Sequence, residues 1–229
     1  NLSTLKRAFV IGSFLRKDHP LVATRLRAAT KSGAKVCVLS GADDELLLPL
    51  AAKMIVAPSD WLAALSEVVV AVAAAKGVAA PAGFEGVTAS EAATRVAAAL
   101  NNELPGAILM GNAAAAHPQA SKLHAAAQWI AEQTGASFGY LGESANSVGG
   151  LLAGAAGKGA ADLFAQPKKA YVLLHAEPEL DAANAQQAHA AVTAAEMVVV
   201  MSSFKHGMDY ADVLLPVSPF SETSGTFVN

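Results

Sequence analysis

The chain opens with a short apolar run, which is followed by a glycine, a polar loop and a helical pattern. Residues 8–11 form an apolar run of strand length that Gly12 ends. Pro20 stands where the first residue of a helix tolerates a missing N–H, and apolar residues follow it at helical spacing. Gly33 breaks this helix, and residues 35–39 again have strand character. The pattern predicts a strand–helix–strand unit with buried parallel strands and a right-handed crossover.

A second segment repeats this order. Residues 107–110 are another apolar run, closed by Gly111. His117-Pro118 is predicted to open a helix at a place equivalent to His19-Pro20, and Gly135 to close it. Residues 137–141 then resume a strand. The first and second units are therefore expected to superpose.

A fainter third copy follows, with predicted strands at 171–174 and 197–201 on either side of a helix within 184–195. Three such units predict an α/β fold in which repeated βαβ units form Rossmann-like parallel sheets with helices on both faces.

The 229 residues are enough for one large or two small domains. Asn101-Asn102 and Pro105-Gly106 break the chain between two helical patterns. We therefore predict a first α/β lobe at 1–104 and a second at 105–229.

Composition excludes several classes of function. The net charge of -3 has no basic excess, which argues against nucleic acid or an anionic membrane surface as a partner. Cys37 is the single cysteine, so the chain can form no internal disulfide and cannot hold an iron–sulfur cluster by itself. Its place between two valines predicts an inert core thiol. Residues 62–80 are apolar but contain charges and a glycine, which favours a buried helix over a membrane span.

Motifs for cofactor chemistry are incomplete. Gly12 lacks the following glycines of the dinucleotide fingerprint, and Gly157-Lys158 lacks both the upstream glycine and the following Ser or Thr of a P-loop. The six histidines have no metal-ligand spacing, and the acidic run at 43–45 is typical of a solvated cap. We predict no catalytic residue and no metal ligand.

Several segments together resemble a known family. They are Ile11-Gly12-Ser13-Phe14-Leu15-Arg16-Lys17-Asp18-His19-Pro20, Gly142 to Gly150, His175-Ala176-Glu177-Pro178, and Tyr210 to Pro216 continuing through Glu222 and Ser224 to Asn229. They resemble the large iron–sulfur subunit of proton-pumping NADH:quinone oxidoreductase (respiratory complex I). The similarity covers nearly the whole chain but only the carboxy-terminal part of that large subunit, whose architecture is similar to molybdopterin oxidoreductases.

The resemblance implies a non-catalytic scaffold domain of the peripheral arm, in a complex that transfers electrons from NADH towards quinone. It implies that the iron–sulfur clusters lie in an amino-terminal part missing here, that this fragment holds no cofactor and is inactive alone, and that the chain continues past Asn229. The implied partners are other peripheral-arm subunits and the amino-terminal part of the same large subunit. The implied location is cytoplasmic, peripheral to the inner membrane, without direct membrane insertion.

Two alternatives stay open. In the first, the chain is part of a molybdopterin oxidoreductase that binds the pterin dinucleotide, with Gly12, Ser13, His19 and Asn146 as the candidate contacts. Against it, Leu39-Ser40-Gly41 stands where those enzymes often carry Asp-Pro-Arg. In the second, the chain is a free-standing nucleotide-binding module.

Overall fold

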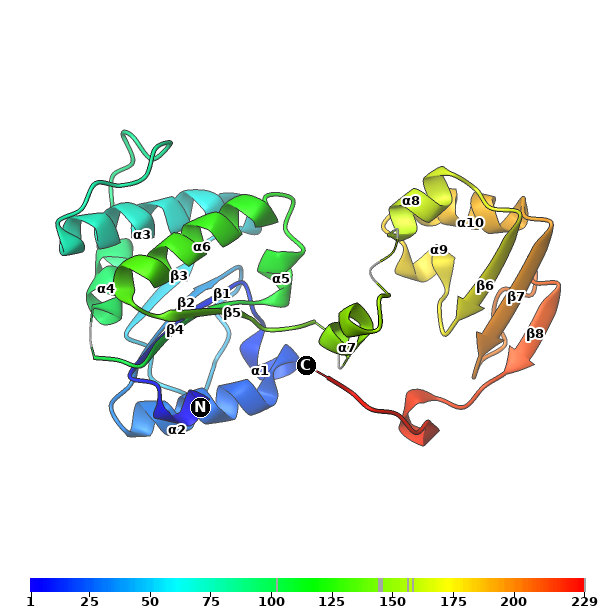
Figure 1. Cartoon of the computed structure of the whole chain (residues 1–229), viewed down its shortest axis with the longest axis horizontal. Helices are drawn as coiled ribbons and strands as arrows, with labels where there is room; N and C mark the ends of the chain where they lie inside the picture. Colours follow the sequence, from blue (N-terminus) through cyan, green and yellow to red (C-terminus); the bar gives the residue numbers. More distant parts are fainter. Residues whose placement is uncertain (102, 144–145, 156, 158, 229) are drawn as a thin grey trace. The chain divides into compact units, whose positions relative to one another are not determined.

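A computed structural model describes residues 1–228 except 102, 144, 145, 156 and 158. The chain forms two compact units, residues 1–144 and 145–229 (Figure 1), and each is described by itself. Parts of the family-like segments, at Ser144-Ala145 and Asn229, therefore lie outside the described residues.

Residues 1–144 contain a five-stranded parallel sheet in the order β3-β2-β1-β4-β5. The strands are β1 (Arg7–Ile11), β2 (Lys35–Ser40), β3 (Ala52–Ile55), β4 (Gly106–Met110) and β5 (Ser137–Tyr140). The helices are η1 (Leu2–Thr4), α1 (Leu15–Asp18), α2 (Pro20–Lys31), η2 (Pro58–Asp60), α3 (Trp61–Lys76), α4 (Glu91–Leu100), α5 (Asn112–Ala115) and α6 (Ala120–Thr134). This strand order is that of a Rossmann-like sheet.

Both faces of this sheet are covered. Helices α3, α4 and α6 lie on one face, and α1 and α2 lie on the other (Figure 1). Alternate residues of β1 supply the two cores: Phe9 and Ile11 pack beneath α3, α4 and α6, whereas Ala8 and Val10 pack beneath α2. Every residue of β1 and of β4 is buried, which confirms the predicted parallel strands with two covered faces.

Helix α3 is the apolar stretch of the sequence. The segment Pro58–Lys76 is long and apolar enough to cross a membrane by length and composition, a test that core helices also pass. Its Leu65, Val68 and Val69 are fully buried in the protein core, as expected for a core helix. Gly77, in a left-handed conformation, ends it as predicted.

A buried cation joins the sheet to its helices. Arg7, at the start of β1, is 2% exposed, and its guanidinium donates hydrogen bonds to the carbonyl oxygens of Leu100 and Thr134. These are the last residues of α4 and α6, where backbone carbonyls lack helical partners and the helix dipole is negative. Burial lowers the pKa of Arg7, while the carbonyl dipoles favour its charged form.

Residues 145–229 contain a second parallel sheet in the order β6-β7-β8. Its strands are β6 (Ala170–Leu174), β7 (Met197–Ser202) and β8 (Val213–Pro216). The helices are α7 (Ser147–Leu152), α8 (Ala160–Ala165), α9 (Pro178–Asp181), α10 (Ala185–Thr193) and η3 (Phe220–Glu222). Tyr171, Leu173, Val198 and Val200 form a core with side chains of α10 and with Phe164 of α8 on one face of the sheet.

The other face of this second sheet is apolar and partly exposed, with Val199, Met201 and Val213 half-buried. Val172 of β6 lies beside Val199 of β7, and Leu174 beside Met201. Val172 and Leu174 of β6 are 67% and 61% exposed, and Leu215 of β8 is 44% exposed. We call this surface the open sheet face; it comprises Val172, Leu174, Val199, Met201, Val213 and Leu215.

The structure confirms the predicted α/β class and the three strand–helix–strand units, β1-α2-β2, β4-α6-β5 and β6-α10-β7. The compact units differ from the predicted lobes 1–104 and 105–229. Because β4 pairs with β1, the chain break near Pro105 lies inside the first unit. The helix start at His117-Pro118 was also wrong in detail: His19 directly precedes α2, whereas His117-Pro118 lies in a turn and α6 begins at Ala120.

The doubly covered sheet predicts a strong effect of buried charge. Val10→Asp or Ile108→Asp should destabilise residues 1–144 by several kcal/mol, because each places an unpaired carboxylate in a closed core. Denaturant unfolding followed by tryptophan fluorescence measures this, since Trp61 and Trp129 both lie in that unit. Leu21→Asp is the matched control, because Leu21 is 79% exposed in the first turn of α2. Equal unfolding midpoints in all three variants would show that β1 and β4 are not covered.

Candidate functional site

The strand order places a switch point between β1 and β4. Helix α2 connects β1 to β2 on one face, whereas α6 connects β4 to β5 on the other face (Figure 1). In open parallel sheets, ligands bind in the crevice at the carboxyl ends of the strands at such a point. Gly12 follows β1 and Gly111 follows β4, so these two glycines mark the crevice.

Protein atoms pack closely around both glycines. A Cβ added to Gly12 would lie 2.7 Å from Cβ of Ala114 and 2.8 Å from Cζ3 of Trp61. A Cβ added to Gly111 would lie 2.5 Å from the carbonyl oxygen of Gly12 and 2.5 Å from Cβ of Ser13. The glycines therefore allow the backbone, α5 and Trp61 to meet closely.

The backbone polar groups at this point are used within the protein. The carbonyl oxygen of Gly12 accepts hydrogen bonds from the N–H groups of Ala113, at 3.1 Å, and Ala114, at 3.3 Å. The N–H of Gly12 donates to the carbonyl oxygen of Leu39 at 2.8 Å. The N–H groups of Gly12, Ala113 and Ala114 are thus directed to protein oxygens.

Ser13 and His19, two of the predicted contacts, bind each other. The Ser13 hydroxyl lies 3.0 Å from Nδ1 of His19, and Nε2 of His19 lies 2.9 Å from the carbonyl oxygen of Gly142. Because a carbonyl oxygen only accepts, Nε2 of His19 is the donor in the contact with Gly142. Nearby, the Asn112 amide donates to Asp18 Oδ2 at 3.0 Å.

The structure therefore brings Gly12, Ser13 and His19 together in residues 1–144, while Asn146 belongs to residues 145–229. The Asn146 side chain accepts a hydrogen bond from the N–H of Val228 at 2.9 Å. It occupies the position before α7 but does not cap that helix with its side chain. Asn146 thus holds the carboxy-terminal segment of its own unit.

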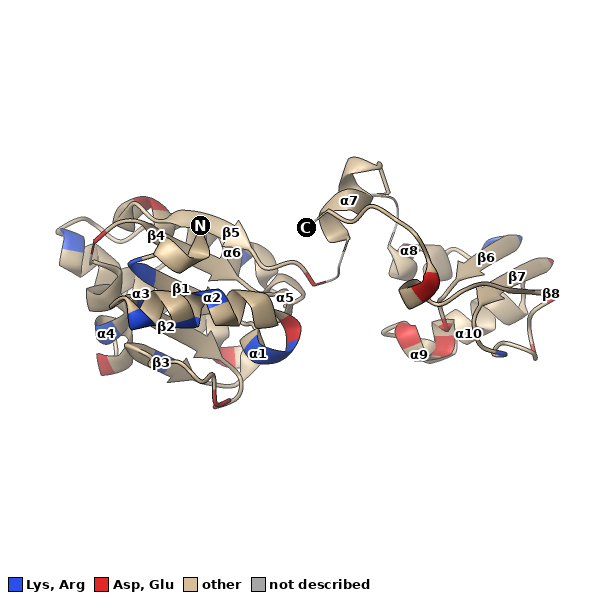
Figure 2. Cartoon of the chain, turned by 90° about the horizontal axis from the view of Figure 1, so that it is seen from below, with Lys and Arg blue, Asp and Glu red and all other residues tan. Residues whose placement is uncertain are grey.

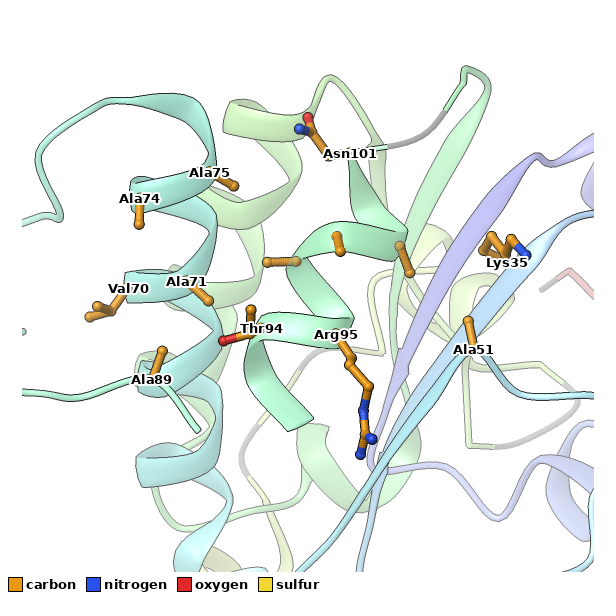
Figure 3. Close-up of a pocket in the computed structure, with 13 residues that line it drawn as sticks. Lys35, Ala51, Val70, Ala71, Ala74, Ala75, Ala89, Thr94, Arg95 and Asn101 are labelled. Carbon is orange, nitrogen blue, oxygen red and sulfur yellow. The ribbon is translucent and has the colours of Figure 1, made fainter. Parts of the chain in front are cut away.

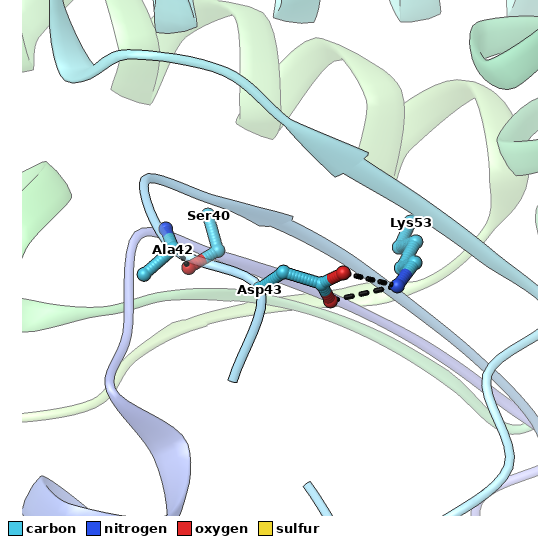
Figure 4. A network of polar contacts seen from close by, with 4 residues as sticks. All are labelled: Ser40, Ala42, Asp43 and Lys53. Carbon is cyan, nitrogen blue, oxygen red and sulfur yellow. Dashed lines mark hydrogen bonds and ion pairs between the residues drawn. The ribbon is translucent and has the colours of Figure 1, made fainter. Parts of the chain in front are cut away.

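The end of β2 carries a small polar network (Figure 4). Lys53 on β3 forms an ion pair with Asp43 at 2.6 Å, and the Ser40 hydroxyl oxygen accepts from the N–H of Ala42 at 3.4 Å. Both charged side chains are about half exposed, at 51% and 59%, so the pair contributes on the order of 0–1 kcal/mol. The acidic run at 43–45 is exposed, as predicted, but it caps no helix, because β3 is the next element after β2.

Cys37 is fully buried, and burial raises the pKa of its thiol to about 12. The thiolate that would act as nucleophile or metal ligand is therefore not formed near neutral pH. The structure agrees with the prediction of an inert core thiol. In the second unit, burial and the hydrogen bond to the Glu179 carboxylate raise the pKa of Tyr210.

Alanines of α3 and α4 line a shallow groove of about 910 Å³ (Figure 3). Its rim carries Lys35 and Arg95, and Arg95 also pairs with Glu91 at 3.1 Å. Among the residues that line it there is no carboxylate, thiol or imidazole. The groove offers mainly apolar contact area, and Lys35, Thr94, Arg95 and Asn101 are its polar side chains.

The close approach at the crevice predicts a large penalty for Gly12→Ala. Gly12 has φ +60, so alanine would pay about 1 kcal/mol for the backbone and about 1–3 kcal/mol more for crowding Ala114 and Trp61. Gly77→Ala is the matched control, since Gly77 has φ +66 and open space around its Cβ position. Tryptophan-monitored unfolding should show the larger loss for Gly12→Ala. Equal losses would mean that the crevice is open in solution.

Comparison with known proteins agrees with this architecture. The curated proteins compared with the chain include no match. The family model for molybdopterin oxidoreductase matches residues 6–229. Because that match spans nearly all of the 229 residues, the chain belongs to the molybdopterin oxidoreductase family.

Proposed function

We propose that this chain is a non-catalytic scaffold domain of the peripheral arm of respiratory complex I, within its large iron–sulfur subunit. In this role it packs against the cluster-bearing part of the same large subunit and against neighbouring subunits, on the cytoplasmic side of the inner membrane. The iron–sulfur clusters that carry electrons from NADH towards quinone would belong to that other part. The observation that carries the proposal is the open sheet face of residues 145–229.

A parallel sheet is normally covered on both faces. The strands β6, β7 and β8 contain no charged residue, and the ribbon segments coloured for charged residues in Figure 2 lie mainly outside them. Val172 and Leu174 would each gain on the order of 1.5–3 kcal/mol from full burial. An apolar, uncharged surface of this kind is typical of a permanent protein–protein contact rather than of solvent-exposed surface.

The family's pterin dinucleotide does not fit the predicted contacts. Ala114 and Trp61 fill the crevice beside Gly12, and Ser13 and His19 are hydrogen-bonded to each other. The strand that would end in Asp-Pro-Arg ends in Leu39-Ser40-Gly41. These features support a family member that keeps the fold without the cofactor.

One observation favours the alternative, a pterin-dinucleotide-binding part of a molybdopterin oxidoreductase. Oδ1 of Asn112 and Nε1 of Trp61, both near the crevice, are buried and have no hydrogen-bond partner in the part of the chain that the structure describes. One uncharged acceptor and one uncharged donor suit a bound water molecule better than a negatively charged pyrophosphate.

Metal analysis of the purified chain separates the two proposals. The scaffold predicts neither molybdenum nor iron in stoichiometric amount, no flavin or cluster absorbance, and no oxidation of NADH with an artificial acceptor. Expression in a host that makes the pterin cofactor ensures that the cofactor is available. A measured content of about one molybdenum per chain, with a bound pterin, would refute the scaffold proposal and support the alternative.

The open sheet face predicts a specific assembly defect. The double variant Val172→Lys and Leu174→Lys should fold with nearly unchanged melting, because both side chains already face solvent in the chain alone. Placed in the full-length large subunit, it should lower co-purification with the other peripheral-arm subunits at least about tenfold, since two lysines would be buried without partners.

Leu152→Lys is the control, because Leu152 is 75% exposed on α7, away from the sheet. Assembly is measured by the amount of peripheral arm recovered with the tagged large subunit. Normal recovery of the double variant would refute a covered sheet face and with it the scaffold proposal.

A further inference from the structure

We propose that Glu177, Glu179 and His206 form a binding site for one divalent transition-metal ion of the zinc class. A carboxylate oxygen of each glutamate and a ring nitrogen of the histidine all lie within 4.8 Å of one another. All three residues belong to residues 145–229 and are partly buried. The site is independent of the scaffold proposal and of the crevice between β1 and β4.

The fold places these residues at the carboxyl edge of the second sheet. Glu177 follows β6 and precedes α9, and Glu179 lies in the first turn of α9. His206 lies in the loop after β7, the strand that pairs with β6. This edge is where parallel α/β sheets present ligand-binding side chains.

His206 provides the observation that points to a ligand. Both of its ring nitrogens are buried, and neither has a hydrogen-bond partner among the described residues. A neutral imidazole has one donor and one acceptor, so this ring leaves both unsatisfied. A buried polar group without a partner is costly, and a bound ion or water is a common reason for it.

The Glu179 carboxylate and the backbone of Glu177 are held in place, and neither glutamate is paired with a lysine or arginine in the described part of the chain. Glu179 Oε2 accepts a hydrogen bond from the Tyr210 hydroxyl at 2.9 Å. The backbone N–H of Glu177 donates to Asp181 Oδ2 at 2.7 Å, which fixes the start of α9. Two neighbouring negative charges favour a divalent cation between them.

The donor set selects the class of metal. Zinc binds imidazole nitrogen and carboxylate oxygen at roughly 2.0–2.2 Å in tetrahedral geometry, so two ligand atoms on one ion lie about 3.3–3.6 Å apart. Side-chain rotations that move each ligand atom by about 1 Å would bring the three atoms to that spacing. Magnesium and calcium prefer all-oxygen sites, whereas an imidazole favours zinc and its transition-metal neighbours. Three protein ligands leave a position for water.

Zinc titration of the tag-free, EDTA-treated 229-residue chain tests the site. Isothermal calorimetry, and metal analysis after dialysis, should give one Zn²⁺ per chain, not displaced by millimolar Mg²⁺. Glu177→Gln, Glu179→Gln and His206→Gln should each weaken binding at least about tenfold. The glutamine variants keep the side-chain size, and amide NMR spectra of each variant establish that residues 145–229 remain folded.

His124→Gln is the matched control, because His124 is hydrogen-bonded to Tyr140 and Gln128 in the other unit. It should bind Zn²⁺ as the unchanged chain does. The proposal is overturned by an absence of saturable binding, or by folded variants at 177, 179 and 206 that bind as tightly as the unchanged chain. Loss of binding in His124→Gln would overturn it equally. The assembly of the Val172 and Leu174 double variant is a separate measurement and decides only the scaffold proposal.

Discussion

Burial of both faces of a parallel sheet is the constraint on which this structure depends. In residues 1–144 the constraint is met inside the unit, because α2 covers Val10 and the helices α3, α4 and α6 cover Phe9. In residues 145–229 the parallel sheet is covered on one face only, and Val172 and Leu174 stay exposed on the other. The difference lies in the connections rather than in the strands: the first sheet has helical connections on both sides, whereas α8 and α10 pack on a single side of the second.

Arg7 shows how the first unit is held in register. A charged side chain at the start of a buried strand is costly unless its hydrogen bonds are made. Here the carbonyl groups at the ends of α4 and α6 accept them, so one guanidinium sets both helices at the amino edge of β1. Gly12, Ala114 and Trp61 meet at the opposite, carboxyl edge of the sheet.

Local patterns in the sequence were sufficient for the elements but not for their assembly. The apolar runs at 8–11 and 107–110, and Gly77 after α3, identified strands and a helix end because these signals are local. The pairing of β1 with β4 is long-range, so the break near Pro105 suggested a boundary between lobes although it lies within one sheet. The predicted start at His117-Pro118 was displaced, because these residues form the turn between α5 and α6 and the helix begins at Ala120. Of the candidate contacts, Gly12, Ser13 and His19 are neighbours in space, but their bonding to each other and to Gly142 depends on tertiary packing.

The carboxyl edges of the two parallel sheets are built differently in this family member. At the first edge, Gly12 permits close contact with Ala114 and Trp61. At the second edge, Glu177, Glu179 and His206 converge, and the histidine nitrogens are left without partners among the described residues. Glu177 and His206 lie far apart in the sequence on segments after different strands, so no spacing rule could pair them. Among the described residues, the buried polar atoms without a partner at the first edge are the uncharged Asn112 Oδ1 and Trp61 Nε1, whereas those at the second edge belong to His206, which lies beside two carboxylates.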